Sequence, residues 1–285
     1  MELVTVEGAN SNMNVRSPSI WGRMPFDQIR NGQVGGVAIY EDFASWGLTP
    51  PTTEGNWAAQ RGWSAFTSGT ATWAAPAATA ATKAGVPNGG ITFGSSSDNG
   101  INGFRTKAVK FMLNRANAKF CAEICMAKST IANTTLETFF GLLEDVALDA
   151  THPFTTTAAT MSDNNMMGIH STESAGSAGS SVYTANGVTA VTVGSGEFTF
   201  AAATYTKIGM KYEPSGDPKG SYILSFYQNG TRLASYKQLP DSNGTDFPTD
   251  VAMCLFFGSR QAAGSSSGTM SVKWVAAAQL YDPQG

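Results

Sequence analysis

Hydrophobic and polar residues alternate along several short runs of this chain. The clearest run is AKFCAEICMAK, residues 118–128, where a strand period of two separates the residues into two faces. One face holds Phe120, Ala122, Ile124 and Met126, and the other holds Cys121, Glu123 and Cys125. Both faces are largely apolar, which is typical of a strand inside a β-sandwich.

Other runs of strand length follow one another to the end of the chain, separated by Gly, Asn and Ser. They cover residues 36–46, 89–96, 108–113, 136–145, 165–170, 181–185, 188–193, 197–201, 205–214, 220–239, 251–260 and 270–282. Asn229-Gly230 supplies the positive backbone angles of a tight hairpin turn, so two strands are expected to pair about it. Residues 136–150 also fit a short helix, although Gly141 weakens that alternative.

Residues 1–36 show no sustained strand or helix period and contain Pro18 and Pro25. We interpret them as an extended N-terminal arm, followed by one sandwich domain over residues 37–285. The arm has apolar side chains that are costly to leave in water, so it should lie on its own domain or on a neighbouring subunit. Its candidate interface residues are Arg16, Trp21, Arg23, Phe26 and Arg30, of which the arginines are spaced by seven.

Composition supports strands over helices. Charged residues make up 14% of the chain, against about 25% in average soluble proteins. Long helices usually need Glu, Lys and Arg on their exposed faces, so the scarcity favours an all-β fold. The net charge of −3 and the lack of a dense basic cluster argue against nucleic acid as a partner.

Charge is unevenly placed along the chain. Residues 105–128 contain six bases and one acid, whereas residues 129–206 contain seven acids and no base. Two solvated faces explain this more simply than a binding patch, although opposite charges would also help subunits to dock.

Three cysteines, Cys121, Cys125 and Cys254, show neither zinc-site nor disulfide-framework spacing. Cys121 and Cys125 would lie about 13 Å apart on one strand, too far to bridge. We expect buried, reduced thiols and assembly in a reducing cytoplasm. No signal-peptide pattern and no membrane span is apparent, so neither export nor a membrane is expected.

The last third of the chain resembles the concanavalin-like or laminin-G-like sandwiches of bacteriophage structural proteins. The resemblance rests on ILSFYQNGTRLASY, TDFPTDVAMCLFFGS and GTMSVKWVAAAQLY, and it extends upstream through EDFASW, GGITFGSSSDNG, AKFCAEICMAK and FFGLLED. It spans roughly Val37 to Tyr281 in order, and residues 1–36 have no counterpart. It implies a jelly-roll sandwich of two antiparallel sheets.

The sequence lacks the catalytic residue patterns that enzymes of this fold carry. Glucanases of this fold place carboxylates at alternate positions of one strand, and no such triple occurs here. His152 and His170 lie in Thr- and Ser-rich text and are expected at the surface. We therefore expect no enzyme activity, no metal and no cofactor.

Two binding alternatives remain open. Trp57, Trp63 and Trp73 are the best candidates for a glycan platform, although a sandwich core or a subunit interface is the more usual place for tryptophan. Asp98-Asn99 and Asp163-Asn164-Asn165 offer oxygens for calcium, but turn chemistry explains them more simply.

The resemblance, the missing active site and the apolar arm together predict a capsid decoration or cement protein. It would bind the major capsid protein as a homo-oligomer, a dimer or trimer, in a virion assembled in the host cytoplasm. The alternative is a glycan- or receptor-binding module of a phage fibre or head surface.

Overall fold

The structure is a computed structural model of the 285-residue chain. It describes residues 16–43, 62–68, 71–74, 90–95, 99–107, 109–113, 119–132, 135–145, 153–154, 165–172, 175–185, 189–216, 221–239, 247–248, 251–262 and 268–281. Within these, only the backbone is described for residues 66–68, 71–74 and 95.

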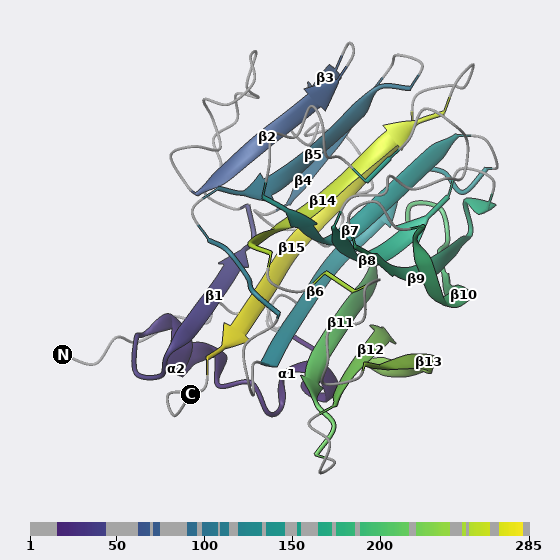
Figure 1. Ribbon diagram of the computed structural model, residues 1–285. Helices are drawn as coiled ribbons and strands as arrows, with labels where there is room; N and C mark the ends of the chain where they lie inside the picture. Colours follow the sequence, from purple (N-terminus) through teal and green to yellow (C-terminus); the bar gives the residue numbers. More distant parts are fainter. Residues whose placement is uncertain are drawn as a thin grey trace.

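Two antiparallel sheets pack face to face (Figure 1). Sheet A contains, in order, β13 (Thr231–Leu239), β12 (Tyr222–Gln228), β11 (Thr206–Pro214), β6 (Lys119–Lys128), β15 (Thr269–Leu280), β4 (Ile91–Ser95) and β3 (Ala71–Ala74), with β1 (Gly36–Glu41) also paired to β15. Sheet B contains, in order, β10 (Val191–Thr199), β9 (Ala178–Thr184), β8 (Met166–Ser171), β7 (Leu136–Glu144), β14 (Met253–Gln261), β5 (Ile101–Thr106) and β2 (Trp63–Ser68). The predicted all-β sandwich of two sheets is confirmed.

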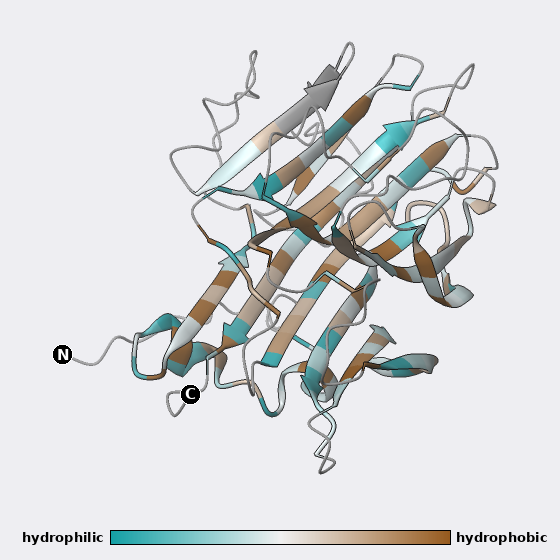
Figure 2. Cartoon of the chain, in the orientation of Figure 1, coloured by the Kyte–Doolittle hydropathy of each residue, from teal (hydrophilic) through white to brown (hydrophobic). Residues whose placement is uncertain are grey.

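The main core lies between the sheets and is built from alternate residues of each strand. In β6 the apolar face predicted from the sequence, which includes Phe120 and Ile124, points into this core. Cys121 and Cys125 point to the outer face of sheet A and belong to a second buried cluster. Figure 2 shows the resulting alternation of brown and teal along the strands. Both faces of β6 are covered, as its sequence predicted.

The helix alternative for residues 136–150 is wrong over its first nine residues, which form β7. Gly141 lies opposite Gly168 of β8, and a Cβ at Gly141 would collide with the backbone of that strand. The glycine therefore serves close strand packing. The hairpin about Asn229 and Gly230 is confirmed, because both have positive φ, 49° and 80°, between β12 and β13.

The N-terminal segment, residues 16–35, differs from the expected extended arm. It forms two short helices, α1 (Pro18–Trp21) and α2 (Phe26–Arg30), which lie against the outer face of sheet A (Figure 1). Pro18 stands at the first helical position, where its fixed φ suits a helix start. Four-residue and five-residue helices are too short to show a helical period in the sequence, and burial of their apolar side chains stabilises them. Residues 1–15 of the predicted arm lie outside the described residues.

Candidate functional site

A buried carboxylate on the outer face of sheet A holds the N-terminal segment. Glu123 lies in the middle of β6 and is 1% exposed. Its Oε2 accepts hydrogen bonds from the backbone N–H of Ser17 at 2.9 Å and from the indole Nε1–H of Trp21 at 2.8 Å. Its Oε1 accepts the hydroxyl of Ser17 at 2.5 Å. Three donors from one short segment thus replace the water that this carboxylate would otherwise need.

The shape of sheet A also lets α1 pack closely on its outer face. Ile20 of α1 is fully buried above Gly209 of β11, where an added Cβ would stand 2.6 Å from the Ile20 Cδ1. Ser19 donates its hydroxyl to the carbonyl of Gly230 in the β12–β13 turn at 2.5 Å. Glycine at position 209 therefore leaves the space that α1 fills.

Trp21 and Phe26, two of the five predicted interface residues, are part of this packing. They are 7% and 4% exposed, and their rings meet edge to face at 5.3 Å. Both side chains pack on the chain's own sheet, which is one of the two alternatives expected for the arm. Arg23 and Arg30 are exposed, and their role at an interface stays a prediction.

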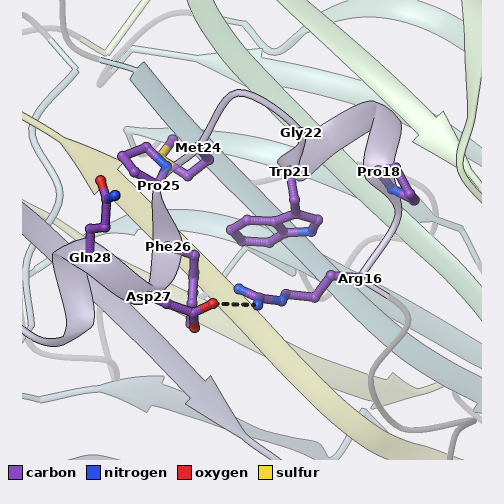
Figure 3. A pocket seen from close by; sticks show the side chains of 9 residues that line it. All are labelled: Arg16, Pro18, Trp21, Gly22, Met24, Pro25, Phe26, Asp27 and Gln28. Carbon is purple, nitrogen blue, oxygen red and sulfur yellow. Dashed lines mark ion pairs between the residues drawn. The ribbon is translucent and has the colours of Figure 1, made fainter.

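A pocket of about 480 Å³ opens between α1 and α2. Figure 3 shows the guanidinium of Arg16 extending between Trp21 and Phe26, toward the carboxylate of Asp27. The guanidinium carbon lies 4.1 Å from the Phe26 ring centroid and 5.6 Å from that of Trp21. Its Nη2 lies 3.7 Å from Asp27 Oδ2.

The chemistry of this pocket favours support of the segment over ligand binding. The charges of Arg16 and Asp27 offset each other, and Asp27 is 74% exposed, so their pairing contributes at most about 1 kcal/mol. The aromatic rings that would offer a stacking surface already contact the guanidinium. Arg16, the third arginine of the predicted interface, is thus engaged within the segment.

The tryptophan candidates for glycan binding do not form a platform in the described residues. Trp63 of β2 is 2% exposed and packs edge to face on Phe257 of β14 at 5.5 Å. It is a core residue, which is the other role considered for it. Trp57 and the side chain of Trp73 lie outside the described residues.

The expectation of a surface histidine at position 170 is wrong. His170 of β8 is 3% exposed, and its Nε2 donates to Oε1 of Glu137 in β7 at 2.5 Å. Oε2 of the same carboxylate accepts from Nε of Arg260 in β14 at 2.5 Å, and Arg260 Nη1 donates to Asn99 Oδ1 at 3.0 Å. The cluster spans three neighbouring strands on the outer face of sheet B, and its buried carboxylate joins two buried bases. His152 lies outside the described residues.

A buried amine lies inside the sandwich. Lys128 of β6 is 1% exposed, and its Nζ donates to Ser171 Oγ at 2.8 Å and to the Gly176 carbonyl at 2.9 Å. Burial lowers the pKa of Lys128 to about 8, and the nearby Glu137 carboxylate opposes that shift in part. Lys128 and Glu123 therefore depart from the solvated face expected for the charge run of residues 105–128, because both are buried.

The described thiols are buried, and the two described asparagines of the predicted calcium turns bond to other side chains of the chain. The described cysteines are free and buried, and burial raises the pKa to about 12 for Cys121 and to about 11 for Cys125 and Cys254. Asn99 has a φ of 58° and accepts from Arg260, in keeping with a turn. Asn165 donates to Glu144 at 2.7 Å. Asp98, Asp163 and Asn164 lie outside the described residues.

No group of three His, Cys, Asp or Glu side chains is placed to hold a metal ion within the described ranges. Neither described helix has the length and apolar character needed to cross a bilayer.

Comparison with known proteins identifies the fold but no family. No family model matches the chain, and no curated protein matches it. Among solved structures, a protein of unknown function from Shewanella oneidensis is 13% identical, with a TM-score of 0.50 over 90% of this chain and 94% of that one. Peanut lectin is 11% identical, with a TM-score of 0.47 over 86% of this chain and 98% of the lectin. An endo-1,3-beta-glucanase from Streptomyces sioyaensis is 11% identical, with a TM-score of 0.49 over 83% of this chain and 100% of that one. At such identities the likeness is one of fold alone, and it assigns no role to this chain.

Proposed function

We propose that this chain is a non-enzymatic structural protein of a bacteriophage particle, which decorates the head by binding the major capsid protein as a homo-oligomer. The ordered resemblance over residues 37–281 to phage structural sandwiches motivates the proposal, and the two-sheet fold agrees with it.

Among the described residues, the two most buried carboxylates both make contacts within the chain, and this observation carries the structural role. Glu123 and Glu137 lie on the outer faces of opposite sheets. The donors of the N-terminal segment surround the first, and His170 and Arg260 hold the second. A glycosidase needs two carboxylates about 5–10 Å apart on either side of a bound sugar. Here each carboxylate instead joins segments of the same chain, which supports a role as a stable scaffold.

The experiment is co-sedimentation of the purified protein with shells assembled from the major capsid protein encoded in the same genome. We expect saturable binding at a fixed ratio to capsid subunits. Shells that sediment without the protein at micromolar concentration would overturn the proposal. An assay of reducing ends released from soluble β-glucans runs in parallel, and sustained release would replace the structural role by a glycosidase.

Glycan binding is the alternative prediction, and after the placement of Trp63 in the core it rests on Trp57 and Trp73. A glycan array probed with the intact protein tests it. Saturable binding to one sugar class, lost on Trp57→Ala or Trp73→Ala but kept in Trp63→Phe, would favour a fibre or head-surface module.

A further inference from the structure

Basic side chains gather on the outer face of sheet A and on the helices that cover part of it. By strand parity and helix position, the bases on this face are Arg16, Arg23, Arg30, Lys119, Lys207, Lys211 and Arg232. Lys273 lies at a register shift of β15, and its contact with Tyr205 places it on the same face. The described acids on the same face are Asp27, Asp42, Glu123 and Glu213. The face thus has four more bases than acids, although the whole chain has a net charge of −3.

Three of these four acids are engaged by groups of the chain itself. Glu123 is buried beneath α1, Asp27 pairs with Arg16, and Glu213 pairs with Lys211 at 2.8 Å. Arg232 on β13 and Lys273 on β15 lie four strand spacings apart, or about 19 Å. Positive charge is therefore spread across five neighbouring strands of sheet A.

Tyrosine rings support the two outlying cations. The guanidinium carbon of Arg232 lies 4.9 Å from the ring centroid of Tyr236, and Lys273 Nζ lies 4.3 Å from that of Tyr205. Tyr236 is 52% exposed. Stacking of this kind holds a cation in place and leaves its remaining donors directed to a partner.

We propose that the outer face of sheet A, beside α1 and α2, is a docking face for an acidic protein surface. Tyr and Arg are the side chains that protein interfaces enrich, and charge complementarity selects the partner and speeds its encounter. The inference depends on the proposed function only for the partner's identity, which is then an acidic area of the capsid protein.

Other polyanions fit the face less well. A sugar or an unpaired base stacks on a free aromatic face, whereas the rings of Tyr236 and Tyr205 already contact cations. A long nucleic acid or acidic polysaccharide also extends beyond the patch and meets the net negative charge of the remaining surface. A compact acidic protein surface meets only the basic face.

The test measures binding of the intact protein to immobilised poly-L-glutamate, with alginate and duplex DNA as competing classes of polyanion. We expect poly-L-glutamate to bind most tightly and to weaken about tenfold or more between low and physiological salt. Arg232→Glu and Lys273→Glu should each weaken binding several-fold, and together abolish it. The matched control is Lys107→Glu, an exposed base beyond the end of β5, which should leave affinity unchanged.

Several other results would overturn the docking face. Preferential binding of alginate or DNA replaces the acidic protein by another class of partner, and equal loss in Lys107→Glu reduces the effect to net charge. Absence of poly-L-glutamate binding at low salt removes the face altogether. Capsid binding that Arg232→Glu leaves intact would remove this face but keep the proposed function. Poly-L-glutamate binding without capsid binding would keep this face but remove the proposed function.

Discussion

The indole N–H of Trp21 donates to the carboxylate of Glu123 at 2.8 Å, and this bond joins residues 102 positions apart across the outer face of sheet A. No basic side chain is among the three donors that reach this carboxylate. A buried carboxylate without such donors would be strongly destabilising. The N-terminal segment from Ser17 to Trp21 is therefore an integral part of the sandwich.

Removing one donor should measure that contribution. Trp21→Phe keeps most of the ring but leaves Glu123 with an unmet hydrogen bond, so we expect the free energy of unfolding to fall by about 1–3 kcal/mol. Urea unfolding followed by far-ultraviolet circular dichroism gives the value. Arg23→Ala, an exposed change in the same segment, should stay within about 0.5 kcal/mol. Additive effects of Trp21→Phe and Glu123→Gln would contradict a direct contribution from this bond.

Deletion of residues 1–35 should destabilise the whole domain. The outer face of sheet A would then expose Cys121, Trp274 and Tyr227, and Glu123 would lose its donors. We expect a lower melting temperature and dye binding to the exposed apolar surface, measured against the full chain. A truncated protein that melts with the full chain would show instead that the segment is an independent arm.

Strand patterns were predictable because their period is short and the evidence for them is local. The sequence pattern assigns Phe120 and Cys121 to opposite faces of a strand, and they lie on opposite faces of β6. The turn at Gly230 depends only on its own backbone angles. The role of Gly141 required knowledge of its partner strand, since a glycine in a run of Leu and Phe weakens a helix and a strand alike.

The polar contacts were not predictable in this way. His170 and Glu137 are 33 positions apart, and Arg260 is 123 positions from Glu137, so only the strand order brings them together. Glu123 did give a local signal, as a single acid between two cysteines on an apolar face. That pattern indicates a buried carboxylate, but it does not say which segment supplies the donors.

The cluster around Glu137 should be highly sensitive to loss of its charge. Glu137→Gln leaves Arg260 buried without its counter-charge, and breaking a buried pair in this way typically costs about 3–5 kcal/mol. Glu144→Gln, on the same strand but partly exposed, is the matched control and should cost less than about 1 kcal/mol. Urea unfolding measures both. Equal costs would indicate that the cluster adds little to stability.

The buried amine of Lys128 predicts a pH dependence of definite sign. Its pKa is lowered from 10.5 to about 8 in the folded chain. Below pH 8 both states hold the proton, and the cost of the buried charge is fully present. Between pH 8 and 10.5 the unfolded state binds more protons, so stability rises with pH, by up to about 3 kcal/mol at the top of the window.

Comparison with Lys128→Met isolates this contribution. The buried cysteines and Tyr40, whose pKa values burial raises, weaken the fold as pH rises above about 9. Those groups are present in both proteins and cancel in the difference of their unfolding free energies. The wild type should therefore gain stability relative to Lys128→Met as the pH increases from 8 to 10.5, and not below pH 8. A difference that stays constant from pH 7 to about pH 10 would mean that Lys128 keeps its ordinary pKa, through water reaching the amine or through the Glu137 carboxylate.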